Sequence, residues 1–525
     1  MHLSRRTALG AAAASLASPG VVRAAGQSTL RFIPVIDLAF IDPIYAGAQV
    51  SRNHGFMVYD TLYGINSALE VSPQMVEGHV VSDDGRQWDL TLRDGLMWHD
   101  GGRVLARDCV ASIGRWARRD AFGAALMRAT DELSAPDDST IRFRLKRPFP
   151  LLPMALGKAA VLAAFMMPER LASQDPFRPL SEAVGSGPFR FVADERVPGA
   201  RNVYARFEGY RPRASGTADW TAGPKIVHYD RVVWTTMPDA GTGVSALQTG
   251  EQDWQETFPH DLVPVLKRTP GVVIRTLDPR GYVCMLRLNH LQAPFNNPAI
   301  RRAVLGAVDQ VAMMTAVAGD DPAYRVTPAG VFTPGTPMAS APPANLFAAA
   351  PDMIRLRDAV KAAGYNGETV VVLVPTNSTV QKPLGDVVAD MFQRAGMNVE
   401  YAGMDFGSVL QRQQKREPSG AGGWSCGAGN WQGIDCVSPA GHPLLAGDAS
   451  AAGWYRSERM ETLRGQWLEA ADLGRQQALA RDIQALAWDE VPFLPLGEYR
   501  QPTAHRTAIT GVLDGTAVFW NVRPA

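Results

Sequence analysis

The chain has 525 residues, of which 46% are hydrophobic, and 52 Lys and Arg residues are balanced by 52 Asp and Glu residues. This length exceeds what one hydrophobic core usually supports, so we expect two or three domains. The balanced charge and the lack of a long basic run argue against nucleic acid and anionic membrane surfaces as partners.

The N-terminal segment predicts export. Arg5 and Arg6 precede an Ala-rich apolar stretch, and Val22-Arg23-Ala24 offers a cleavage point. This pattern is typical of a twin-arginine signal, removed here as residues 1–24. No cysteine follows the cleavage point, and no later apolar run reaches the roughly twenty residues of a membrane span. We therefore expect a periplasmic protein that is soluble after signal removal and is not inserted in the membrane.

Apolar periodicity predicts helices and strands that alternate along the chain, which indicates a mixed α/β fold. The predicted strands are 29–34, 87–92, 139–145, 226–234, 281–288 and 369–374. The predicted helices are 51–62, 108–116, 297–317, 352–363, 383–395 and 457–489. Turn signals such as Arg93-Asp94-Gly95 separate them.

The four cysteines do not match a metal-ligand pattern. Cys109 lies in a helical pattern and Cys284 in a strand pattern, so a buried free thiol is expected for each. Cys426 and Cys436 leave two alternatives open, a disulfide or two independent apolar side chains. His442 does not complete a compact ligand spacing with them, and no H-E-x-x-H motif occurs. We expect neither a metal nor a cofactor.

Residues 422–436, GGWSCGAGNWQGIDC, contain a G-x-S-x-G match centred on Ser425. Asp435, His442 and His505 follow it in the order of a catalytic triad. A nucleophile elbow needs a strand before the serine and a helix after it, and the flanking glycines disfavour a helix start. An exported serine hydrolase using Ser425 is therefore the alternative hypothesis, and we assign no catalytic residue.

Eight short motifs, in order, resemble the signature segments of the family 5 extracellular solute-binding proteins, the peptide- and nickel-type receptors of ABC importers. The motifs lie at 73–78, 82–85, 92–101, 185–189, 246–253, 294–303, 362–365 and 491–496. The resemblance covers the chain from about residue 29 to about residue 520.

The resemblance implies a two-lobed α/β periplasmic-binding-protein fold that encloses a ligand between its lobes. Lobe one would comprise 27–262 plus 497–525, with an extra subdomain inserted at about 50–180, and lobe two would comprise 263–496. The implied function is a monomeric receptor that captures a small peptide-like or other polar organic solute for an ABC permease with its cytoplasmic ATPase. A sensory or scaffolding role is a further alternative.

In many peptide-binding members, a Gly-Trp pair on lobe two is followed, three residues past the tryptophan, by an aspartate that receives the ligand's ammonium group. Gly423-Trp424 matches the pair, but Gly427 occupies the aspartate position. We interpret 422–436 as a glycine-rich loop that lines the cleft, and the ligand classes considered are a peptide, an opine, a sugar or a metal chelate. Three alternatives stay open: Asp435 replaces the missing charge, the ligand lacks an ammonium group, or the ligand is held by stacking on the aromatic side chains Trp424, Trp431, Trp454 and Tyr455. The candidate ligand-binding residues are Trp424, Asn430, Trp431, Asp435, Trp454 and Tyr455.

Overall fold

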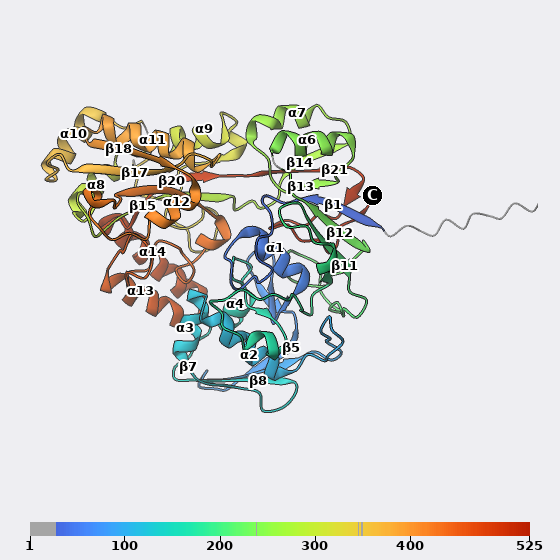
Figure 1. Ribbon diagram of the computed structural model, residues 1–525. Coiled ribbons are helices and arrows are strands. Elements are labelled where there is room, and N and C mark those ends of the chain that lie inside the picture. The colour runs from blue at the N-terminus through green and yellow to red at the C-terminus, as the bar shows by residue number, and fades with distance from the viewer. Residues whose placement is uncertain (1–27, 238, 345, 348–349) are drawn as a thin grey trace, which may run out of the picture.

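Two large sheets organise the chain into two lobes (Figure 1). The computed structural model describes residues 28–525 except 238, 345, 348 and 349, so the predicted export signal lies outside the described residues. We call residues 28–276 and 502–525 lobe one, and residues 282–499 lobe two.

The sheet of lobe one has seven strands in the order β10-β11-β12-β1-β13-β21-β14. Their bounds are β10 (Phe189–Phe191), β11 (Arg201–Arg206), β12 (Arg231–Thr235), β1 (Thr29–Ile33), β13 (Trp254–Gln255), β21 (Pro502–Arg506) and β14 (Val272–Thr276). β1 runs parallel to β12 and β13, and the other pairs are antiparallel. Figure 1 shows α6 (Ala240–Thr249) and α7 (Val263–Lys267) on one side of this sheet and α1 (Gln49–Val58) on the other.

Residues 60–180 of lobe one form the subdomain, which lies beyond α1 (Figure 1). Its four-stranded antiparallel sheet has the order β5 (Val76–Val81), β6 (Gln87–Leu92), β8 (Thr140–Leu145) and β7 (Thr130–Ser134). Its helices are α2 (Ala106–Ala117), α3 (Ala121–Ala129), α4 (Leu152–Gly157) and α5 (Glu169–Ala172). Short strand pairs join β2 (Asp60–Thr61) to β9 (Phe165–Met166), and β3 (Tyr63–Ile65) to β4 (Val71–Pro73).

The sheet of lobe two has six strands in the order β16-β20-β15-β19-β17-β18. Their bounds are β16 (Arg325–Val326), β20 (Phe493–Tyr499), β15 (Tyr282–Leu288), β19 (Cys426–Gln432), β17 (Thr369–Pro375) and β18 (Asn398–Met404). The helices of this lobe are α8 (Pro298–Leu305), α9 (Gln310–Ala318), α10 (Met353–Ala362), α11 (Gln381–Arg394), α12 (Phe406–Arg412), α13 (Glu458–Glu469) and α14 (Leu473–Glu490). β22 (Ile509–Thr510) and β23 (Arg523–Pro524) complete the C-terminal part of lobe one.

The chain crosses between the lobes at residues 277–281 and 500–501, later than the boundaries near 262 and 496 that the sequence suggested. The reason is that β14 pairs antiparallel with β21 along five residues, so both strands belong to the sheet of lobe one. β20 pairs with β15 up to Tyr499 and therefore stays in lobe two.

Two long helices predicted from periodicity are each divided in the structure, because an aspartate caps a new helix inside the pattern. The region 297–317 contains α8 and α9, and the Asp309 side chain accepts a hydrogen bond from the amide of Ala312. The region 457–489 contains α13 and α14, and Asp472 caps α14 in the same way. Side chains of this type compete with the helical backbone and favour N-terminal positions.

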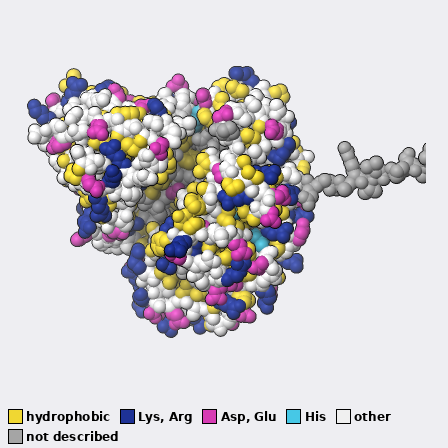
Figure 2. All heavy atoms as spheres, viewed as in Figure 1, with side chains coloured by type: hydrophobic (Ala, Val, Ile, Leu, Met, Phe, Trp, Pro, Cys, Tyr) yellow, Lys and Arg dark blue, Asp and Glu magenta, His cyan; other side chains and the backbone are white. Residues whose placement is uncertain are grey.

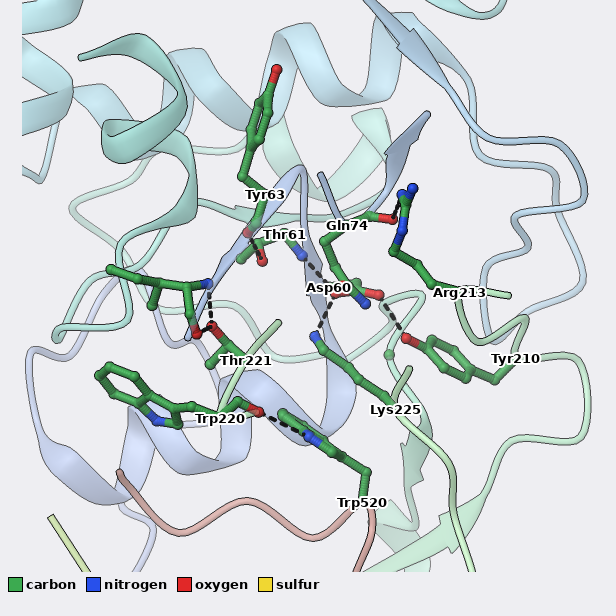
Figure 3. Close-up of polar contacts among 12 residues, drawn as sticks. Asp60, Thr61, Tyr63, Gln74, Tyr210, Arg213, Trp220, Thr221, Lys225 and Trp520 are labelled. Atoms are coloured by element: carbon green, nitrogen blue, oxygen red, sulfur yellow. Dashed lines mark hydrogen bonds and ion pairs between the residues drawn. The ribbon is translucent and has the colours of Figure 1, made fainter. Parts of the chain in front are cut away.

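A buried ion pair connects the subdomain to the rest of lobe one, and Figure 3 shows Lys225 and Tyr210 converging on Asp60. Lys225 Nζ lies 2.7 Å from Asp60 Oδ1, and both side chains are at most 1% exposed. The same ammonium group lies 4.7 Å from the ring centre of Trp520 near the C-terminus. Removing one partner of such a pair typically costs about 3–5 kcal/mol, because the other charge is left buried without compensation.

Candidate functional site

A cavity of about 950 Å³ lies between lobe two and the subdomain, where Figure 2 shows the surface hollowed. Lobe two contributes the end of β19 and the residues that follow it, together with α12 and the start of α14. The subdomain contributes the turn at 68–70, the start of α3 and the segment 158–162. A concave site of this size between two lobes is the usual setting for a small ligand.

Three of the six predicted site residues line this cavity: Asn430, Trp431 and Asp435. Asn430 and Trp431 belong to β19, which lies between β15 and β17 and is held by hydrogen bonds to both. Asp435 lies in the short 3₁₀ helix Gly433–Cys436 that follows. The glycine-rich stretch is therefore mainly a strand with a helical turn, and the prediction of a loop is wrong.

Gly429 of β19 and Gly433, which follows the strand, lie so close to neighbouring atoms that a larger residue would clash with them. A Cβ atom on Gly429 would lie 2.6 Å from the ring of Trp431, and one on Gly433 would lie 2.0 Å from the carbonyl oxygen of Arg280. A methyl group cannot occupy either position without displacing its neighbours. The glycine content thus reflects close packing, and it fixes the Trp431 ring across the strand where it faces the cavity.

Asp435 contributes a buried carboxyl group to the lobe-two wall of the cavity. Burial raises the pKa of Asp435, while Arg52, Lys158 and the backbone amide of Val161 favour its charged form. No basic nitrogen of the described residues lies within ion-pair distance of this carboxylate. Removing an anion from water without a partner is unfavourable, so Asp435 is suited to receive a cationic group.

On the subdomain wall, Lys158, Asp120 and Arg119 have partners, and Glu70 accepts a hydrogen bond from Asn66 Nδ2 at 2.8 Å. Lys158 forms an ion pair with Asp120, which also caps α3 by accepting hydrogen bonds from two backbone amides. The Arg119 guanidinium lies over the rings of Tyr45 and Phe177, at 5.6 and 5.0 Å from their centres. Asp435 and Glu70 are thus the two acidic groups of the cavity that form no ion pair with a described residue, and Asp435 is the less exposed of the two.

Much of the remaining wall is apolar. On lobe two, Phe406 and Leu410 of α12 and Leu473 of α14 are exposed to solvent and also line the cavity. On the subdomain, Phe122, Met154, Val161 and Leu162 face the same space. The wall therefore offers an apolar surface beside the Asp435 carboxyl group.

The structure does not bring the other three predicted site residues to the cavity. Trp424 is fully buried and packs with Val371 and Leu373 of β17 and with Trp454, whose ring centre is 6.0 Å away. Tyr455 is 7% exposed, and its hydroxyl donates a hydrogen bond to Glu490. These side chains lie in the interior of lobe two because Trp424 precedes β19 and packs against the neighbouring strand.

Sequence reasoning missed a second set of polar residues at the cavity: Gln49, Arg52, Glu256, Tyr282 and Gln432. They come from α1, β15, β19 and the residue that follows β13, which are far apart in the sequence and adjacent only in the fold. Gln49, Tyr282 and Gln432 line the cavity, and the Arg52 guanidinium donates a hydrogen bond to Gln432 from behind the wall. No local motif marks them.

Residues 70–435 match the profile of the bacterial extracellular solute-binding proteins, family 5 (middle). The chain belongs to this family. The sequence resemblance in eight motifs is thereby confirmed.

Several relatives resemble this family 5 protein over nearly its whole length. A probable peptide ABC transporter periplasmic-binding protein of Sinorhizobium fredii is 36% identical and both chains are covered completely. A glutathione-binding protein of Pectobacterium atrosepticum is 26% identical, with 97% of this chain and 96% of the relative covered. The solved structure of a Helicobacter pylori periplasmic binding protein with the peptide STSA has a TM-score of 0.78 at 21% identity, covering 95% and 98% of the two chains. This structural likeness confirms the two-lobed fold.

Ser425 has a structural role in this family 5 protein. Its Oγ accepts a hydrogen bond of 3.0 Å from the amide of Val371, and the side chain is 1% exposed. β19 begins directly after it, so the strand–serine–helix order of a nucleophile elbow is not present. The triad hypothesis also fails on geometry, because His442 bonds to the carbonyl of Val331 and His505 lies in β21 of lobe one.

The structure also resolves the cysteine alternatives. All four cysteines are free and buried, so Cys426 and Cys436 are two apolar side chains and form no disulfide. Burial raises the pKa of each thiol. Within the described ranges, no group of three or more His, Cys, Asp or Glu side chains is placed to hold a metal ion. No helix in the part of the chain that the structure describes is long and apolar enough to cross a membrane.

Proposed function

We propose that the chain is the periplasmic receptor of an ABC importer, and that it captures a small peptide or peptide-like solute with a cationic group. The observation that carries this proposal is the cavity between the lobes, where the unpaired Asp435 carboxylate lies beside Trp431 and apolar side chains. An ammonium group would pair with Asp435, and the apolar parts of the ligand would contact the wall.

The named relatives support this ligand class. Two proteins that align with nearly all of this chain have a ligand in their names. The first is named for peptides and the second for glutathione, which is a tripeptide derivative. Both kinds of ligand have an ammonium group, amide bonds and side chains. A cavity with the buried carboxyl group of Asp435, hydrogen-bonding side chains such as Asn430, and an apolar wall is compatible with these features.

Delivery to a permease requires that the importer distinguishes loaded from empty receptor. The two crossings at 277–281 and 500–501 would act as a hinge, and a ligand that contacts both lobes would favour the closed arrangement. The partners are accordingly the ABC permease and its cytoplasmic ATPase, and the receptor acts as a monomer.

The predicted twin-arginine signal supports a periplasmic location. Replacing Arg5 and Arg6 by lysine is expected to retain the precursor in the cytoplasm, as cell fractionation would show. Normal export of this variant would contradict the twin-arginine route and leave the ligand proposal unaffected.

Calorimetric titration with leucylalanine and N-acetyl-leucylalanine tests the ligand proposal. Acetylation removes the positive charge and keeps the rest of the molecule. We expect the free dipeptide to bind about tenfold or more tightly than the acetylated one, because only the first pairs with Asp435. Equal binding of both, or binding of neither, would contradict the proposed recognition of a cationic peptide.

A further inference from the structure

A second cavity of about 1170 Å³ lies between the main sheet of lobe one and lobe two. The end of β1, the segment 255–264 and the end of α9 form its walls. Three residues line both this cavity and the ligand cavity: Gln49, Tyr282 and Asn430. The space between the lobes is thus one cleft with two chambers, which meet at these side chains.

A direct contact across the cleft separates the chambers. Tyr282 of lobe two donates a hydrogen bond of 2.5 Å from its hydroxyl to Oε1 of Gln49 in lobe one. The Tyr282 ring is stacked on Tyr499, with ring centres 5.2 Å apart and planes inclined by 12°. The Tyr499 hydroxyl accepts a hydrogen bond from Nδ2 of Asn430 at 3.2 Å. The stacking on Tyr499 therefore holds the Tyr282 ring in the position where its hydroxyl contacts Gln49.

The lobe-one side of this contact is fixed as well. Glu256 accepts hydrogen bonds on Oε1 from Gln49 at 2.7 Å and from Asn53 at 2.6 Å. Arg52 donates to Asn53 and to Gln432, and Gln432 donates in turn to the Tyr282 hydroxyl at 3.4 Å. The chain of hydrogen bonds closes on itself and crosses the cleft twice.

Burial shifts the pKa of two members of this closed set of contacts. Burial raises the pKa of Tyr282 to about 12, so its hydroxyl stays protonated and donates at neutral pH. Glu256, which is 3% exposed, has a raised pKa for the same reason. Arg52 Nε has no hydrogen-bond partner among the described residues, so the network is satisfied only in part. Breaking one further member leaves other buried groups without partners.

We propose that the Gln49–Tyr282 contact is a specificity determinant that ends the ligand chamber and limits the length of the bound solute. The inference rests on the proposed function, because it concerns the same cleft. A bound peptide advances by about 3.3–3.6 Å for each extended residue. A ligand with one residue too many has to pass between Gln49 and Tyr282, and this requires opening the hydrogen-bonded set on both lobes.

The test is an affinity series with peptides that begin with leucine and are extended by alanines, from leucylalanine to the hexapeptide. For the unmodified receptor we expect binding up to a certain length and an affinity loss of about tenfold or more beyond it. In the double variant Gln49→Ala with Tyr282→Ala the two chambers become continuous, so the length limit moves to longer peptides. The matched control is Gln248→Ala with Tyr401→Ala, which removes the same side-chain types from exposed positions.

Two outcomes separate this inference from the proposed function. If the unmodified receptor binds leucylalanine and the double variant binds it with an unchanged length limit, the partition is overturned and peptide capture stands. If no peptide binds the unmodified receptor, the proposed function is overturned and the length limit with it. Should the double variant fail to fold, Gln49→Ala alone is expected to move the limit in the same direction, since it removes the lobe-one half of the contact.

Discussion

At the residue scale, the two tryptophans of the stretch 422–436 have different roles although their surroundings in the sequence are alike. Trp424 is fully buried in lobe two, whereas Trp431 lines the cavity and lies across Gly429. An Arg287 guanidinium 5.8 Å from the Trp431 ring centre supports its orientation. The sequence pattern of aromatic residues between glycines predicts that some of these residues line the cavity. Which tryptophan lines it depends on the register of β19.

Alanine substitutions at the two tryptophans are expected to separate binding from stability. Trp431→Ala should weaken ligand binding by about 1–3 kcal/mol, because a large apolar contact is lost. Trp424→Ala should instead lower the free energy of unfolding by about 3–5 kcal/mol, because it leaves a cavity in a packed core. Calorimetric titration and urea denaturation of both variants measure the two quantities. The reverse assignment of effects would contradict the site described here.

Asp435 makes a prediction about pH. Its pKa is raised by burial, so the carboxyl group takes up a proton more readily than an exposed aspartate as the pH falls. Protonation removes the charge that pairs with a cation, and affinity for a cationic ligand should decline as the pH falls through this raised pKa. Titration of leucylalanine at a series of pH values between about 4 and about 8 would show the decline. In Asp435→Asn the affinity should be lower and nearly independent of pH over the same range.

At the scale of the elements, the sequence predicts the strands whose apolar residues follow a regular pattern along their whole length. β1, β6, β15 and β17 lie within a residue or two of their predicted bounds. β19 escaped prediction because two of its seven residues, Gly427 and Gly429, are glycines, which are unfavourable in strands unless packing requires them. Asp309 and Asp472 divide two predicted helices because their capping contacts outweigh the continuing apolar pattern. The residues that α1 and β15 bring to the cavity are far apart in the sequence, so no local sequence pattern predicts that they form one site.

β20 carries a buried acid that links stability to pH. Glu498 is 1% exposed, its Oε2 has no hydrogen-bond partner among the described residues, and burial raises its pKa to about 8. The folded state therefore binds a proton that the unfolded state releases above its ordinary pKa of about 4.3. The free energy of unfolding should fall by up to about 1.4 kcal/mol per pH unit as the pH rises between these two values.

Glu498→Gln tests this link, because glutamine keeps the shape and cannot ionise. Urea denaturation between about pH 5 and about pH 9 should show a flatter stability profile for Glu498→Gln and a higher stability than the parent at the alkaline end. The exposed Glu77→Gln on β5 serves as the control and should leave the profile unchanged. Identical profiles for the parent and Glu498→Gln would show that this carboxyl group does not set the pH dependence.

At the scale of the whole molecule, two kinds of contact cross the cleft between the lobes. Arg147 of the subdomain forms an ion pair of 2.7 Å with Glu469 of α13, and Arg52 of α1 reaches Gln432 of β19. The first contact is half exposed and contributes little, whereas the second is buried. Under the proposed hinge closure, opening about the two crossings would break both contacts, and a ligand that bridges the lobes would favour the closed state.

Closure has a measurable consequence for the size of the molecule. Small-angle scattering should give a smaller radius of gyration with saturating ligand than without it, because the lobes approach one another about the crossings at 277–281 and 500–501. The variant Gln432→Leu removes a buried contact between the lobes and should shift the ligand-free protein towards the larger radius. A radius that stays the same on ligand addition in both proteins would contradict hinge closure.

The central claim is that a small solute is held between the lobes beside Asp435 and Trp431. Native mass spectrometry of the receptor isolated from its own host's periplasm tests this most directly, because the bound solute is weighed with the protein. We expect one solute bound per chain in the parent and in the exposed-surface variant Gln248→Ala with Tyr401→Ala. The same solute should be largely lost from Asp435→Asn with Trp431→Ala. Equal occupancy in this last variant, with the fold intact, would contradict the claim.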